Sequence, residues 1–102
     1  MGWGGHGTAS SDFWNYLRDT MRTVSEIPHP LMRIHITQWN GKFAMRFELD
    51  RYEQVFKISE EDVSSLADVE RLAGQMTEEV LRRFVAMRSD FVARFQESKN
   101  TE

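Results

Sequence analysis

Apolar side chains recur along the chain with two different periods. Over residues 11–27 they are spaced by three or four positions, as on one face of a helix. Over residues 31–58 apolar and polar residues alternate, as in β-strands. Over residues 66–96 the helical spacing returns. The pattern predicts an α+β fold: an N-terminal helix, a three-stranded antiparallel meander, then one long or kinked C-terminal helix pair packed on one sheet face.

The first predicted helix begins at a serine and ends before a proline. Ser10 or Ser11 can accept hydrogen bonds from the free amides of the first turn, and Asp12 suits the positive end of the helix dipole. The helix should end before Pro28, because proline disfavours helical geometry in the residue before it. Its apolar face would consist of Phe13, Leu17, Met21 and Val24.

The turn of the first hairpin is predicted at Asn40-Gly41. These two residues accept the positive φ angles of a type I′ turn, which suits the twist of paired strands. The turn fixes a register in which Ile36 faces Met45. A slip by one residue would mix apolar and polar residues on both faces. The polar pairs that this register places on the other face include His35 with Arg46 and Arg33 with Glu48.

A second turn at residues 50–51 should pair the third strand with the second. Two features fit this pairing less well. Gln54 falls on the apolar face, and Glu48 lies opposite Glu53. A bulge or a wider loop near Asp50 would relieve both problems.

The C-terminal third carries capping signals and a possible break. Ser59 is an N-cap candidate, and Ser65 with Asp68 three residues later is a second. Gly74 lies inside the helical pattern, where glycine costs about 1 kcal/mol relative to alanine. We therefore favour two helices, or a kinked one, over a single straight helix.

The apolar arc of the C-terminal helix is wider than one three-stranded sheet can cover. We expect the excess to form a homodimer interface. The alternative is a helix packed on both sides by the first helix and the sheet. The residues of the candidate dimer face are Leu81, Phe84, Val85, Phe91, Val92 and Phe95.

Composition indicates one globular domain. The chain has 102 residues, of which 40% are hydrophobic and 28% charged, as in ordinary folded proteins. We expect a disordered Gly-rich tail at 1–9, a single domain at 10–97 and a short disordered tail at 98–102. No stretch approaches the roughly 18 apolar residues of a membrane span. We therefore expect a cytoplasmic protein without membrane contact.

No motif for catalysis, metal binding or cofactor binding is present. The chain has no cysteine, and its histidines lack the short spacing of metal ligands. The only carboxylates that the predicted register brings together are Glu48 and Glu53, on an exposed strand face. We therefore predict a non-enzymatic protein with no catalytic residues, no metal and no cofactor.

The polar face of the sheet is a candidate binding face. It combines cations with one large aromatic ring, a mixture that suits an anionic ligand. A net charge of -3 and a single aromatic residue on this face argue against nucleic acid as a partner. The candidate binding residues are Arg33, His35, Trp39, Arg46 and Lys57.

Two functions follow from these patterns. The first is a small protein-interaction or regulatory module that acts as a homodimer through its C-terminal helix. The alternative is a binder of an anionic small ligand or nucleic acid through the polar sheet face. The predicted element order over residues 11–96 is similar to the first half of the type III secretion chaperone-like fold, whose further strands have no counterpart here. That similarity involves no residue motif and implies nothing about function.

Overall fold

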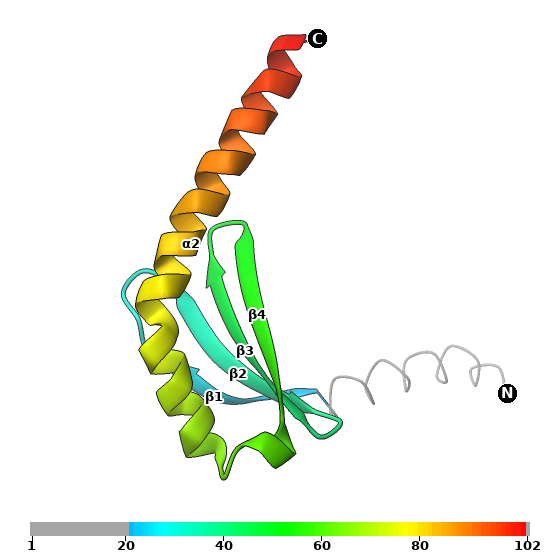
Figure 1. The fold of residues 1–102 in the computed structure, drawn as a ribbon, viewed down its shortest axis with the longest axis vertical. Helices are drawn as coiled ribbons and strands as arrows, with labels where there is room; N and C mark the ends of the chain where they lie inside the picture. Colours follow the sequence, from blue (N-terminus) through cyan, green and yellow to red (C-terminus); the bar gives the residue numbers. More distant parts are fainter. Residues whose placement is uncertain (1–20, 102) are drawn as a thin grey trace, which may run out of the picture.

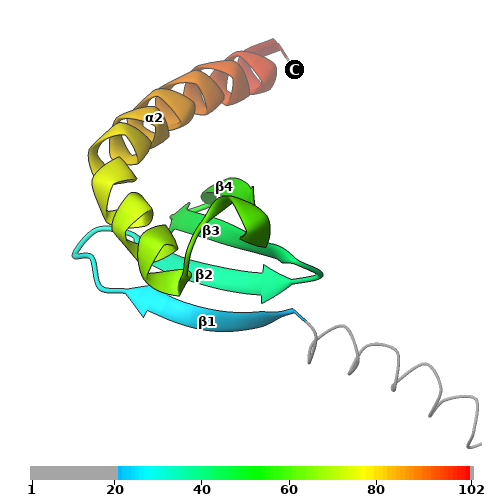
Figure 2. The same ribbon diagram turned by 60° about the horizontal axis from the view of Figure 1, so that its bottom comes forward.

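A computed structural model describes residues 21–101, in which four strands precede one long helix (Figure 1). The strands pair antiparallel in the order β1-β2-β3-β4, and the helix lies on one face of this sheet (Figure 2). We call this face the closed face and the opposite one the open face. The elements are β1 (Arg22–Ile27), β2 (Arg33–Trp39), β3 (Lys42–Leu49), β4 (Tyr52–Ser59), the 3-10 turn η1 (Glu60–Asp62) and α2 (Leu66–Thr101).

The predicted N-terminal helix is wrong where the structure describes it, and the sheet has four strands instead of three. Residues 22–27 form β1, paired with β2. Thr23, Val24 and Ile27 are β-branched and favour strands, and β2 offers them an edge to pair with. The predicted helical residues 11–20 and the tail at 1–9 lie outside the described residues. The element order that resembles the type III secretion chaperone-like fold is therefore not found in the described part.

The predicted strand registers are confirmed. Ile36 faces Met45 across β2 and β3, and Glu48 faces Glu53 across β3 and β4. Asn40 and Gly41 have φ angles of 54° and 75°, as a type I′ turn requires. The structure has neither a bulge nor a wider loop near Asp50. Pairing continues without a shift up to a two-residue turn, in which Asp50 has a φ of 58°.

The predicted helix pair is also wrong, because α2 is continuous through Gly74. Val69 and Ala73 before the glycine, and Val80 and Phe84 after it, are all buried against the same sheet. Burying a large apolar side chain contributes about 1.5–3 kcal/mol, which exceeds the cost of one glycine. Packing on both sides of Gly74 therefore keeps the helix whole. The helix also includes residues 98–101.

The core lies between α2 and the closed face. Gln54 is a polar residue on this face. Its side chain donates a hydrogen bond to the Val80 carbonyl oxygen at 2.9 Å, so its partly buried amide has a partner. Ser59 caps η1, and the Asp68 carboxylate accepts a hydrogen bond from the Ser64 amide at 2.9 Å, before the first turn of α2. The core includes Met32, which directly precedes β2, and the strand residues Ile34, Ile36, Phe43, Met45 and Phe47.

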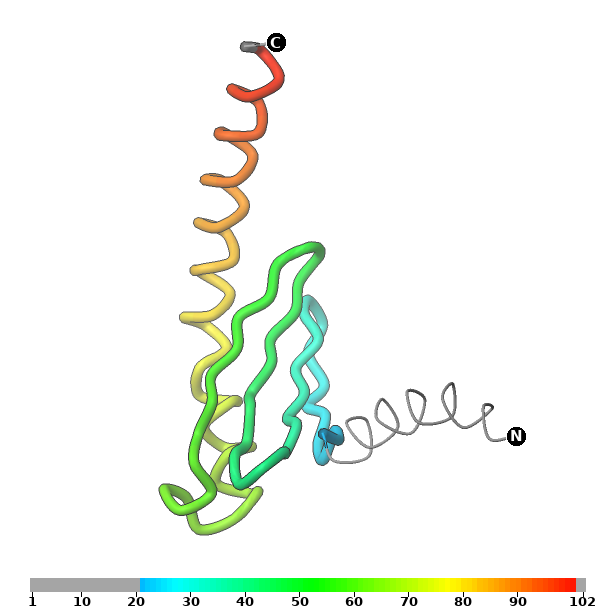
Figure 3. The backbone as a smooth tube through the Cα atoms, turned by 90° about the vertical axis from the view of Figure 1, so that its right-hand side faces the viewer, coloured from blue at the N-terminus to red at the C-terminus, as the bar shows by residue number. Residues whose placement is uncertain are grey.

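The C-terminal part of α2 extends past the sheet (Figure 3). The helix has 36 residues and thus a length of about 54 Å, whereas an eight-residue strand such as β4 spans about 27 Å. The sheet therefore cannot cover the whole helix. We call residues 88–101 the arm, and every arm residue from 88 to 100 is exposed.

Candidate functional site

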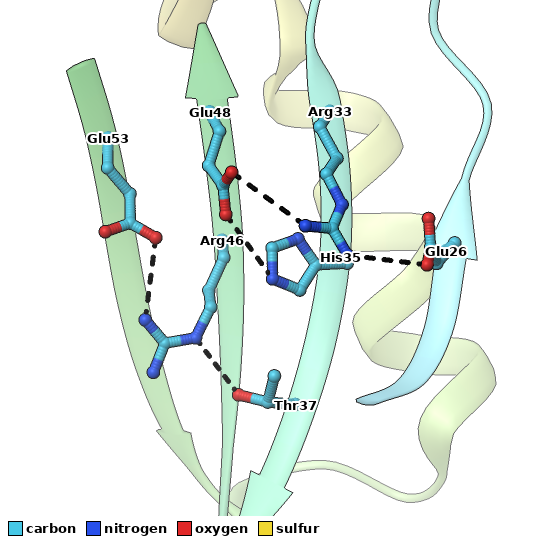
Figure 4. Close-up of polar contacts among 7 residues, drawn as sticks. All are labelled: Glu26, Arg33, His35, Thr37, Arg46, Glu48 and Glu53. Carbon is cyan, nitrogen blue, oxygen red and sulfur yellow. Dashed lines mark hydrogen bonds and ion pairs between the residues drawn. The ribbon is translucent and has the colours of Figure 1, made fainter. Parts of the chain in front are cut away.

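The open face carries all five predicted binding residues, but carboxylates neutralise its central cations (Figure 4). A guanidinium nitrogen of Arg33 lies 3.5 Å from a Glu26 carboxylate oxygen, and another lies 4.0 Å from Glu48. Arg46 lies 3.6 Å from Glu53, and its Nε donates a hydrogen bond to the Thr37 hydroxyl at 3.2 Å.

This network explains how two glutamates can face each other. Glu48 contacts Arg33 on one side, and Glu53 contacts Arg46 on the other (Figure 4). Each carboxylate therefore has its own cation, which offsets their mutual repulsion. Sequence reasoning missed Glu26, because it placed that residue on a helix instead of on β1. The β-branched residues Thr23, Val24 and Ile27, which favour strands, were the signal that could have found it.

His35 is a buried, neutral part of this face. Its side chain is covered by its neighbours, and its Nε2 lies 3.6 Å from a Glu48 oxygen. Burial, and after it the positive charge of Arg33, lowers the pKa of His35, although Glu48 acts in the opposite direction. Its Nδ1 is buried without a hydrogen-bond partner among residues 21–101. His35 therefore adds no cation at neutral pH.

The remaining two predicted residues, Trp39 and Lys57, line a hollow of about 160 Å³ at the Asn40-Gly41 end of the open face. Lys42 and Lys57 are exposed and form no ion pair with any described residue. We call this the Trp39 hollow, and its wall and floor include Met21, Thr37, Trp39, Lys42, Ala44 and Lys57.

The structure divides the predicted dimer residues between the core and the solvent. Phe84 is only 1% exposed and belongs to the core of its own chain, and Leu81 packs partly against that core. Val85 is 66% exposed, and the other three are exposed by 39–45%. We call these four exposed residues the arm surface: Val85, Phe91, Val92 and Phe95.

The turn between β3 and β4 covers one side of the arm surface. The Tyr52 ring meets Phe91 edge to face with 6.2 Å between centroids, and Phe91 stacks on Phe95 at 5.6 Å. The Arg51 guanidinium lies 5.1 Å from the centre of the Phe91 ring. A cavity of about 210 Å³ lies beside Tyr52, and Phe84, Val85 and Arg88 also line it. The hairpin thus fixes Phe91 while leaving much of the surface uncovered.

Other kinds of site find little support in the described part of the chain. Among residues 21–101, no three His, Asp or Glu side chains gather closely enough to hold a metal ion. No helix of this part combines the length and hydrophobicity needed to cross a bilayer. A scan against protein-family models and searches of curated proteins and solved structures found no match to the chain. The arm surface and the Trp39 hollow are therefore the two candidate binding sites.

Proposed function

We propose that this protein is a non-enzymatic interaction module that pairs with a second copy of itself through the arm surface. One observation carries the proposal: the apolar stripe that α2 buries against its own sheet continues past the sheet with the same helical spacing. Phe84 is buried, whereas Phe91 and Phe95, further along the same stripe, are exposed by 39% and 45%. A contiguous exposed apolar surface of this kind is typical of an interface.

The geometry of the arm favours a second copy of the same chain as its binding partner. The arm extends clear of the sheet, so the arms of two copies related by a twofold axis can lie side by side. Each arm then covers the apolar surface of the other, and one patch serves both copies. The cavity of about 210 Å³ beside Tyr52 and Val85 has room for an apolar side chain of the second arm.

The charges of the arm are compatible with this pairing. Residues 88–101 contain three basic and two acidic side chains, a balance of +1, so two arms repel each other weakly. The Arg51 and Lys99 cations lie over the Phe91 and Phe95 rings. Long cationic side chains can cover apolar surface while their charged ends stay in water, which lets them rim an interface.

Sedimentation equilibrium of the full chain tests the proposal. We expect the native protein to be a dimer and Val92→Glu to be a monomer, because the substitution places a charge inside the contact. Leu72→Glu is the matched control, since Leu72 is also an exposed apolar residue of α2, 37% exposed, but lies on the covered half. A native protein that stays monomeric at high micromolar concentration, or a Val92→Glu variant that still dimerises, contradicts the proposal.

Anion or nucleic-acid binding across the whole open face has weaker support. Its two arginines already contact Glu26, Glu48 and Glu53, and His35 is neutral. Any ligand of the central face would have to replace these contacts. The lysines of the Trp39 hollow pair with no carboxylate among residues 21–101, and this hollow is considered separately below.

A further inference from the structure

The Trp39 hollow combines an aromatic wall, a small-residue floor and two cations. Trp39 remains 38% exposed, whereas Ala44, which also lines the hollow, is buried. Lys42 and Lys57 belong to neighbouring strands, with Ala44 directly opposite Lys57. Within residues 21–101, neither lysine has a carboxylate partner. This chemistry suits a segment that carries aromatic rings and a carboxylate.

The chain enters the described structure at the edge of this hollow. Met21, which lines the hollow and is 42% exposed, is the first described residue. Residues 12–17, a few positions before it, read DFWNYL. They contain three aromatic rings, one leucine and one carboxylate, Asp12. This segment therefore contains the aromatic rings and the carboxylate that would complement Trp39 and the two lysines of the hollow.

The length of this segment matches the width of the sheet. From Met21 beside β1 to Lys57 on β4 there are three interstrand steps, or about 14 Å. The nine residues from Asp12 to Met21 cover about 13 Å at the rise of a helix, and more when extended. Asp12 can therefore reach the lysines while the aromatic residues lie over Trp39 and Ala44.

We propose that residues 12–17 bind over the Trp39 hollow of their own chain. Their rings cover Trp39, Ala44 and Met21, and the Asp12 carboxylate meets the ammonium groups of Lys42 and Lys57. A short tether gives the segment an effective concentration of about millimolar, which favours it over a segment from elsewhere. This binding is independent of the pairing of arms and uses the opposite side of the sheet.

Paramagnetic NMR on the full chain tests this assignment. Because the chain has no cysteine, Asn15→Cys creates a single attachment point for a nitroxide label. We expect the label to remove intensity from the amide peaks of Ala44, Val55 and Lys57, compared with the same sample after reduction. A label at Ser98→Cys on the arm is the matched control and should leave these peaks unchanged.

Two further samples identify the occupant and the role of the lysines. In a mixture of ¹⁵N-enriched unlabelled protein with spin-labelled protein of natural abundance, the three peaks should keep their intensity. In a Lys42→Glu, Lys57→Glu variant carrying the Asn15→Cys label, the peaks should recover intensity, because Asp12 is now repelled. Full intensity in the original labelled sample overturns the proposal. Loss of intensity in the mixed sample assigns the segment to a second copy and overturns binding in cis, and an unchanged loss in the double variant overturns the role of the lysines.

Discussion

The two halves of α2 have the same apolar stripe but different surroundings. In the half from Leu66 to Met87, the stripe is buried against the closed face of the sheet. In the arm, residues of the same kind and spacing are exposed, and the β3–β4 turn lies beside them on one side. The difference lies in where the sheet ends. An apolar pattern shows that a helix face needs a cover, whereas only the fold shows whether its own chain supplies one.

The largest expected difference between the two halves is in folding stability. Phe84→Ala should lower the free energy of unfolding by about 3–5 kcal/mol, because it leaves a cavity in the core. Phe95→Ala, in the exposed arm, should change the stability of the monomer by about 0.5 kcal/mol or less. Urea unfolding at low protein concentration measures both. Equal losses would mean that the arm belongs to the core of the monomer.

A change of pH should affect folding stability but have little effect on dimerisation. Because the pKa of His35 is lowered by folding, the unfolded chain binds its proton more readily. The stability that neutral His35 contributes is present above its ordinary pKa of 6.5 and decreases as the pH falls below that value. The arm contains no histidine. Urea unfolding, measured once above and once below pH 6.5, should therefore give a smaller free energy of unfolding at the lower pH.

Between the same two pH values, the dissociation constant of the dimer should change much less than the free energy of unfolding. His35→Gln is the matched variant, and it should remove most of the pH dependence of unfolding between them. An equal dependence in the native protein and the variant would rule out His35 as its source.

Gly74→Ala tests whether packing alone keeps the covered half helical. Apart from its chain neighbours and the adjoining helix backbone, the added methyl group meets no atom within 4 Å, so only helix propensity should change. We expect a gain of about 0.5–1 kcal/mol in unfolding free energy, with no change in pairing. Gly41→Ala is the control with the opposite sign, since the φ of Gly41 is +75°. A loss of stability in Gly74→Ala would show that the glycine has a structural role in α2.

The sequence predicts the centre of the sheet well because one local signal determines many contacts. Asn40-Gly41 sets the turn, the turn sets the register, and the register separates the closed face from the open one. The same register places Arg33, Arg46 and Glu48 on one face. The pairing of each arginine with a particular carboxylate depends on side-chain geometry and was not predicted.

The wrong predictions share a different cause, because they depend on contacts between distant residues. The apolar spacing around Val24 fits a helix as well as a strand, and the free edge of β2 decides between them. Gly74 suggests a break by local propensity, but contacts with the sheet outweigh it. The sequence groups Phe84 with the arm residues, but whether it is buried depends on where the sheet ends.

Hydrogen exchange of the full chain at two protein concentrations tests the central claim most directly, because it shows which half of α2 becomes covered by pairing. We predict that amides of residues 88–101 exchange more slowly at high concentration than at low concentration, while those of residues 66–87 exchange at rates that change little. Arm amides that exchange at the same rate at both concentrations, in a protein that is shown to dimerise, would contradict pairing through the arm.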